Sequence, residues 1–150
     1  MVAKRRLIPS EHDEQKAVVQ WFQSYARTKG IDPRLLFSLP NAQILLGLCK
    51  SDKDRLKVLA YLKAEGLQPG VPDLFLAHYK KGDLYPTGQS GHYVQAVDFC
   101  GLFIELKRKG GKPSKDQLFM ADLLRCAGFN VVIAYGFEEA QRAIRAYIET

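Results

Sequence analysis

The 150-residue sequence has few cysteines and no long apolar run, and both absences restrict what the protein can be. Its three cysteines, Cys49, Cys100 and Cys126, are odd in number, widely spaced and embedded in apolar sequence. This arrangement predicts buried free thiols in a reducing compartment rather than a disulfide framework or a zinc site. No apolar run approaches the roughly 20 residues that span a bilayer, and the basic N-terminus lacks the apolar segment of a secretory signal. We therefore expect a cytoplasmic protein with no membrane partner.

Glycine-rich nucleotide-binding motifs are absent as well, because the chain contains no G-x-G-x-x-G or Walker sequence. A phosphate-ligand-binding α/β protein is therefore a weak hypothesis. The sequence also shows no internal repeat and no inter-domain linker, so we expect residues 1–150 to form a single domain with a buried core. The composition, 47% hydrophobic and 25% charged, is typical of a globular chain.

The charge balance is basic, with 22 lysines and arginines against 16 acidic residues and a formal net charge of +6. A basic surface suits a polyanionic partner, because the neutralisation of phosphates supplies much of the affinity for nucleic acid. Many soluble proteins without such a partner are equally basic, so charge alone does not identify one.

Capping residues and apolar periodicity predict an alternation of helices and strands. In chain order, the expected elements are a helix from Ser10 to about Gly30, a short strand or buried connector at 35–39, a helix capped by Ser51, strands at 74–77 and 102–107, a helix capped by Ser114, a strand at 130–135 and a helix around 140–148. The 130–135 run is β-branched without alternation, as expected for a strand covered on both faces. This order implies an α/β fold in which helices flank a central mixed β-sheet.

Residues 78–100 hold most of the turn-forming sequence and are expected to form an inserted, protruding hairpin or loop, strand-like at 93–97. Its tyrosines and lysines could touch a partner, but a solvated insertion is the simpler interpretation. His78 and His92 lack metal-ligand spacing, so we expect neither to bind a metal.

The stretch Gly70–Asp73 and the later pattern Glu105-x-Lys107 carry the chemistry of the sequence. Side chains of a strand alternate between its faces, so Glu105 and Lys107 should project from the same side while Leu106 faces the core. Neighbouring strands lie about 4.8 Å apart, so Asp73 can converge with Glu105 on one hard cation such as Mg²⁺. Lys107 would then lie beside the cation as a donor. We therefore predict a metal-dependent phosphodiesterase centre.

Each of these motifs alone has an ordinary structural explanation. Asp73 would fit a Pro-Asp turn, and Glu105 with Lys107 would fit an exposed charge pair on a strand. Their combination is more informative, because both polar clusters lie at the ends of apolar core strands. A charge in such a place is costly unless something binds it.

Acidic residues of the first predicted helix could complete a shell of hard oxygen ligands. At 100° per residue, Glu11, Glu14 and Gln15 fall on the same stripe as Val18 and Phe22. Acids in a first turn also interact favourably with the helix dipole. Periodicity alone decides neither between these explanations nor between Glu11 and Glu14.

Three motifs, Gly70–Leu74, Phe103–Lys107 and Ser114-x-x-Gln117, resemble those of the VRR-NUC domain. This domain is a branch of the PD-(D/E)xK nuclease superfamily and has a restriction-endonuclease-like fold. The resemblance covers nearly the whole chain, and Leu39–Asn41 looks like the small, stand-alone, phage-type members. Two departures, the 78–100 insertion and the lack of a glycine and an arginine after Asn41, concern substrate geometry and not the metal centre.

The resemblance implies a Mg²⁺- or Mn²⁺-dependent DNA endonuclease and gives roles to the residues of the predicted centre. By that resemblance, Asp73 and Glu105 bind the divalent metal and Lys107 is the catalytic lysine. The backbone carbonyl of Leu106 is implied as a further metal ligand.

The resemblance also identifies Gln117 as a motif glutamine that faces the site from the start of its helix. Its capping-box role competes with this one, because a single side chain cannot easily do both. The family further places a glutamate in the first helix, four residues before a glutamine. Glu11 with Gln15 fits that spacing better than Glu14 does, so Glu11 is the first choice as a metal ligand and Glu14 the second.

Small stand-alone members resemble homodimeric enzymes that cut DNA junctions, since one site per protomer can cut two strands symmetrically. We therefore expect branched DNA, including four-way junctions, as the substrate. A non-catalytic DNA-binding module that keeps the nuclease fold is the competing hypothesis. The basic residues beside the site lie in a loop that leads into a helix N-terminus, a suitable place for a phosphate, although a solvated basic loop is the simpler alternative. They are Arg108, Lys109, Lys112 and Lys115.

Overall fold

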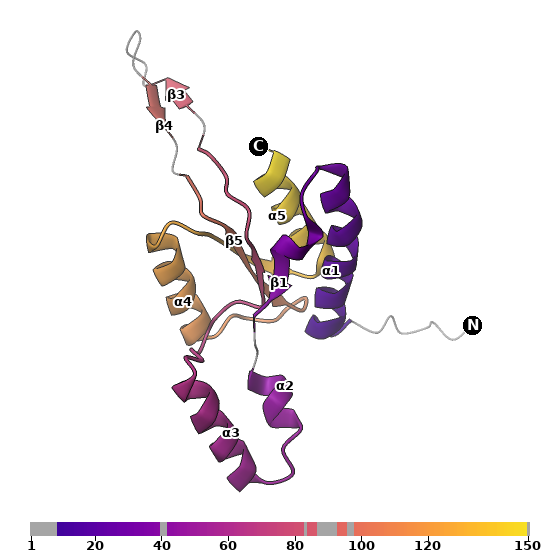
Figure 1. Cartoon of the computed structure of the whole chain (residues 1–150), viewed down its shortest axis with the longest axis vertical. Coiled ribbons are helices and arrows are strands. Elements are labelled where there is room, and N and C mark those ends of the chain that lie inside the picture. Colours follow the sequence, from indigo (N-terminus) through magenta and orange to yellow (C-terminus); the bar gives the residue numbers. More distant parts are fainter. Residues whose placement is uncertain (1–8, 40–41, 83, 87–92, 96–97, 150) are drawn as a thin grey trace, which may run out of the picture.

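The computed structural model of the chain describes residues 9–39, 42–82, 84–86, 93–95 and 98–149. Helices and strands alternate along it, and Figure 1 shows their arrangement. In chain order they are α1 (Glu11–Thr28), the 3-10 helix η1 (Pro33–Leu35), β1 (Leu36–Ser38), α2 (Ala42–Gly47), α3 (Asp52–Ala64), β2 (Leu74–Leu76), β3 (Leu84–Pro86), β4 (Tyr93–Gln95), β5 (Leu102–Lys107), α4 (Lys115–Cys126), β6 (Asn130–Tyr135) and α5 (Phe137–Glu149).

Four of the strands form one mixed sheet in the order β1-β2-β5-β6. The pairs β1–β2 and β2–β5 are antiparallel, whereas β5 and β6 run parallel and are connected through α4. The register of β2 and β5 places Leu74 opposite Ile104, so Asp73, the residue before β2, comes next to Glu105. A mixed sheet flanked by helices confirms the predicted α/β class.

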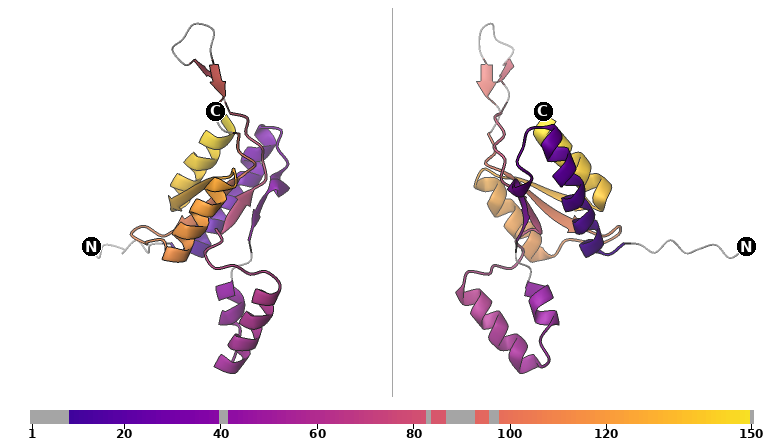
Figure 2. Two further views of the ribbon diagram at one scale, coloured as in Figure 1. Left: turned by 90° about the vertical axis from the view of Figure 1, so that its left-hand side faces the viewer. Right: turned by 45° about the vertical axis from the view of Figure 1, so that its right-hand side comes forward.

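One face of the sheet is buried under α1 and α5, and α4 packs beside β6 on the other face (Figures 1 and 2). Burial of a large apolar side chain stabilises the fold by about 1.5–3 kcal/mol. This core holds β2 and β5 together at the point where Asp73 and Glu105 lie. Its largest fully buried side chains are Val18, Phe22, Leu74, Leu76, Leu102, Ile104, Leu106 and Ile144.

Serine N-caps begin three helices at the predicted positions. The hydroxyls of Ser10 and Ser51 accept hydrogen bonds from the backbone N–H groups of Asp13 (3.2 Å) and Asp54 (3.1 Å). Ser114 forms the predicted capping box at the start of α4. Each cap of this kind is worth about 1 kcal/mol, so short-range sequence signals determine where α1, α3 and α4 begin.

The expectation that the cysteines are buried is wrong. No disulfide joins the three cysteines, all of which lie in described parts of the chain, but Cys100 and Cys126 are exposed and Cys49 is half-buried. Cys126 is the last residue of α4 and Cys100 lies in the connection before β5, and neither place is covered by the core. The strand β6 is covered on both faces, by α5 and by α4, as its β-branched run predicted, and of its six residues only the last, Tyr135, is exposed.

Two hairpins extend from opposite ends of the sheet (Figures 1 and 2). At one end, β3 and β4 pair antiparallel within the 78–100 insertion, and Lys80 and Phe99 form a bridge at its base. His92 and residues 96–97 of the expected strand lie outside the described residues. At the other end, α2 and α3 pack against each other as a helical hairpin. In the part of the chain that is described, no helix has both the length and the apolar character needed to cross a membrane.

Candidate metal centre

Asp73, the residue before β2, lies next to Glu105 of β5 at one end of the sheet. The Oδ2 atom of Asp73 accepts a hydrogen bond from the backbone N–H of Leu106 at 2.8 Å. The Lys107 Nζ atom donates to Oε1 of Glu105 at 2.5 Å, so these two side chains project from the same side of the strand, as the alternation predicted. The structure therefore brings together two carboxylates and an ammonium that lie far apart in the sequence.

The Glu105 carboxylate is buried, with only 3% of the residue exposed. Its Oε1 atom accepts from Lys107 and from the Gln117 side-chain amide. Its Oε2 atom is buried and has no hydrogen-bond partner among the described residues. A buried polar atom without a partner is rare in folded proteins and costs stability, so Oε2 is free to bind a cation.

Burial dominates the electrostatics of both carboxylates. It raises the pKa of Glu105 to about 7, against the lowering effect of the hydrogen bond from Lys107 and with a smaller rise from the Asp73 charge. Burial also raises the pKa of Asp73 above its ordinary value, against the Leu106 N–H and the Lys107 charge. Burial by itself would lower the pKa of Lys107, but the hydrogen bond to Glu105 and the neighbouring carboxylates outweigh it and raise that pKa. The ammonium therefore stays charged.

These residues fit a hard divalent cation. Two carboxylates with raised pKa values and one orphaned oxygen supply the negative charge and the oxygen donors that Mg²⁺ or Mn²⁺ requires. The Leu106 carbonyl oxygen lies 3.2 Å from the Lys107 Nζ atom, so it belongs to the same cluster. Within the described residues, no group of three or more His, Cys, Asp or Glu side chains is placed to hold a metal. The remaining ligands would be water, which Mg²⁺ commonly retains.

The first helix places its two candidate glutamates in different surroundings. Glu11 lies at the centre, because its Oε1 atom accepts from the Arg108 backbone N–H at 3.3 Å and its Oε2 atom lies 3.9 Å from the Lys107 Nζ atom. Glu14 points elsewhere, and its Oε2 atom accepts from the Phe137 N–H at 2.8 Å, where it caps the start of α5. Geometry therefore favours Glu11, which periodicity could not separate from Glu14.

Gln117 makes both of the contacts that were expected to compete. Its Oε1 atom accepts from the Ser114 backbone N–H at 2.8 Å, and its Nε2 atom donates to Glu105. The expectation of a conflict is wrong, because the acceptor and the donor of an amide are different atoms and can bind on two sides. Gln117 thus links the start of α4 to the buried carboxylate.

The four basic residues predicted to bind nucleic acid lie in and just after the loop between β5 and α4, and all are exposed. None of their side chains forms an ion pair with another described residue. Their positive charges are therefore available to an anionic partner. They are Arg108, Lys109, Lys112 and Lys115.

Gly70 determines how closely the turn before Asp73 approaches α4. Its φ angle is +80°, in the region that favours glycine, and a side chain there would collide with the backbone carbonyl of Asp116. Gly70 and Asp116 both line a cleft of about 370 Å³ beside Asp73 and Gln117, and residues of α3 line it as well. No pattern in the sequence indicated that α3 would line a cleft at the centre.

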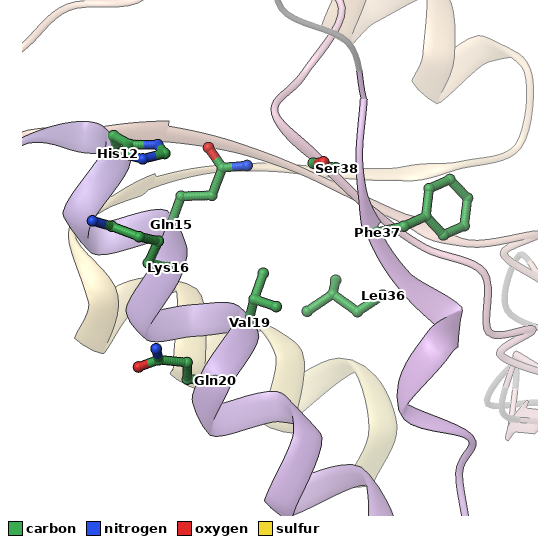
Figure 3. A pocket seen from close by; sticks show the side chains of 8 residues that line it. All are labelled: His12, Gln15, Lys16, Val19, Gln20, Leu36, Phe37 and Ser38. Atoms are coloured by element: carbon green, nitrogen blue, oxygen red, sulfur yellow. The ribbon is translucent and has the colours of Figure 1, made fainter.

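A second cavity, of about 330 Å³, lies between α1 and β1 (Figure 3). Gln15, one turn after Glu11, extends across this cavity toward Ser38. Val19 and Leu36 form its apolar floor. Gln15 therefore lines a cavity beside β1, the strand that pairs with the one after Asp73.

The fold and the arrangement of acidic, basic and amide side chains define a nuclease-type α/β domain. Residues 6–138 match the VRR-NUC domain family. A solved structure described as a "VRR_NUC domain protein" is similar to the chain, with 20% identity and a TM-score of 0.67 over 95% of this chain and 91% of that one. No curated protein sequence matches at a significant level. The chain belongs to the VRR-NUC domain family and has its restriction-endonuclease-like fold.

Proposed function

We propose that the chain is a Mg²⁺- or Mn²⁺-dependent DNA endonuclease that hydrolyses phosphodiester bonds. The observation that carries the proposal is the buried Glu105 carboxylate, which has an unpartnered Oε2 atom beside Asp73 and the Lys107 ammonium. Such an arrangement is costly and is typical of functional sites. A divalent cation would satisfy both carboxylates at once. Membership of the VRR-NUC family supports the same class of activity.

In this proposal, Asp73, Glu105 and the Leu106 carbonyl would hold the metal directly. Glu11 does not form a metal-holding group of three acids with them among the described residues, so its carboxylate would act as a further ligand through a bound water. The bound metal would lower the pKa of a coordinated water and polarise a phosphate oxygen. Lys107 keeps its proton, so its ammonium can orient the attacking water and neutralise charge that develops on the phosphate. Gln117 is a positioning residue that fixes the orientation of Glu105 through its amide.

The exposed basic residues between Arg108 and Lys115 would bind DNA phosphates next to the site. We further propose selectivity for branched DNA, such as four-way junctions, and activity as a homodimer. Two symmetric sites would allow one assembly to cut two strands. The unpaired positive charge of this loop beside the carboxylates supports DNA binding at the site, and the resemblance to small stand-alone relatives motivates the proposed selectivity and homodimer.

Cleavage should depend strictly on a divalent metal. Purified protein should cut labelled DNA in Mg²⁺ or Mn²⁺, and cleavage should stop when EDTA is added. A panel of matched four-way, flap, single-stranded and linear duplex substrates measures the structural preference. Salt-sensitive DNA binding without cleavage in either metal would support a non-catalytic binding module instead. A four-way junction cut no faster than linear duplex would remove the preference for branched DNA.

Glu11→Ala should affect mainly cleavage and Glu14→Ala mainly stability, because the two side chains contact different parts of the molecule. Glu11→Ala should lower the cleavage rate about 10- to 100-fold with little change in stability, since this side chain is half exposed. Glu14→Ala removes the cap of α5 and should lower the free energy of unfolding by about 1 kcal/mol, with cleavage by the folded protein unchanged. Single-turnover cleavage and urea unfolding measure the two effects. The reverse pattern would move the assignment to Glu14.

A further inference from the structure

The cleft next to Asp73 has two unlike walls. One wall consists of the start of α4 and the Gly70 turn, which lie beside the central sheet. The opposite wall comes from α3 and the residues that follow it. The lining residues on the α3 side are Leu59, Lys63, Leu67 and Gln68, and those on the α4 side are Ser114, Asp116 and Gln117.

Packing on the hydrophobic core does not explain the position of α3. None of its residues is buried, and it packs mainly against α2 in a hairpin that extends away from the sheet (Figures 1 and 2). Most helices of a folded protein are held by an apolar face that packs on a core. A helix without such a face, with one end at the edge of the candidate centre, is placed to contact a substrate.

The charges of the residues that line the cleft indicate which side chain would contact the substrate. The cleft contains Asp73 and Asp116, so a polyanion that enters it needs a compensating cation. Of the residues that line the cleft, all of them described, Lys63 is the one that carries positive charge. Its side chain is exposed and forms no ion pair with another described residue. The basic loop between β5 and α4 holds its charges on a different element.

We infer that Lys63 is a substrate-binding residue that contacts a DNA backbone phosphate in the cleft. This inference rests on the proposed nuclease function and extends it, because it assigns a second DNA-contacting surface on the α2–α3 hairpin. DNA is then held from two elements, by Lys63 of α3 and by the basic loop that follows β5. Phosphate contacts of this kind position the substrate and carry no sequence information.

The test compares Lys63→Ala with Lys53→Ala. Both substitutions remove one lysine from the same helix, but Lys53 lies in the first turn of α3, at the end of the hairpin away from the cleft. Lys63→Ala should raise KM for DNA about five- to tenfold with kcat changed by less than about twofold. The slope of log affinity against log salt concentration should fall by about one. Lys53→Ala should leave KM, kcat and this slope unchanged, and Lys63→Arg should restore them.

A purely structural role for Lys63, at the C-terminal end of α3, would lower the melting temperature without changing the salt slope. Binding is measured by fluorescence anisotropy in EDTA, so it does not depend on cleavage. Wild-type protein that binds but never cuts DNA would overturn the proposed nuclease function, and the salt slope of Lys63→Ala would still decide the contact. Active wild-type protein with equal KM and salt slope in Lys63→Ala and Lys53→Ala would overturn this inference alone.

Discussion

Replacing Lys107 with alanine should lower the DNA-cleavage rate by about 10²- to 10³-fold while metal binding is retained. The Lys107 ammonium is charged and fixed by Glu105 at 2.5 Å, so it provides positive charge where a phosphate would develop negative charge. The substitution removes that stabilisation, and it also removes a cation that competes with the metal for Glu105. Single-turnover cleavage and calorimetric titration with Mn²⁺ measure the two quantities separately.

Asp73→Ala is the matched comparison, because it removes a proposed metal ligand and leaves the ammonium in place. We expect it to lose both cleavage and metal affinity, and Glu105→Ala should do the same. Thermal unfolding of each variant shows whether the fold is intact. Full activity in any of the three variants would refute the assignment of the centre.

The second large effect concerns the stability of the metal-free protein. Burial raises the pKa of Glu105 to about 7 in the folded state, whereas an unfolded glutamate titrates near 4.3. At pH values between these two pKa values, the folded protein binds more protons than the unfolded chain. The free energy of unfolding should therefore fall as the pH rises through this window. The expected loss is of the order of 4 kcal/mol. Asp73, whose pKa burial also raises, contributes with the same sign.

Melting temperatures in EDTA between pH 4.5 and 8 test this expectation. Glu105→Gln should flatten the profile, because the amide does not titrate. Asp13 and Asp32, whose pKa values are lowered to about 2 by hydrogen bonds from Ser10 and Arg34, titrate well below the window and do not mask it. Added Mg²⁺ or Mn²⁺ should restore stability most at pH 8, where the carboxylates are ionised. A metal-free melting temperature that rises across the window would contradict the raised pKa of Glu105.

Short-range signals made most of the fold predictable from the sequence. The serine caps at Ser10, Ser51 and Ser114 mark helix starts through hydrogen bonds that span three residues, and strand alternation places Glu105 and Lys107 on one side. The pairing of Asp73 with β5 followed from two apolar runs that had to lie in one sheet. These features depend on residues that are close in the sequence or on a single pairing between two strands.

The features that the sequence did not reveal depend on contacts between distant segments. Glu14 caps a helix that begins 123 residues later, and no periodicity in α1 carries that information. The dual role of Gln117 required the direction of its amide, and the place of Lys63 required the path of the chain between α3 and the Asp73 turn.

Gly70 limits the ways in which the specificity of this protein can be engineered. Its backbone lies against the Asp116 carbonyl, so no larger residue can be introduced there to reshape the opening. Variation that alters substrate choice and spares the carboxylates can come instead from the side chains of α3, none of which is buried. The helical hairpin is therefore the natural target for directed evolution, while the glycine turn is a position to leave unchanged.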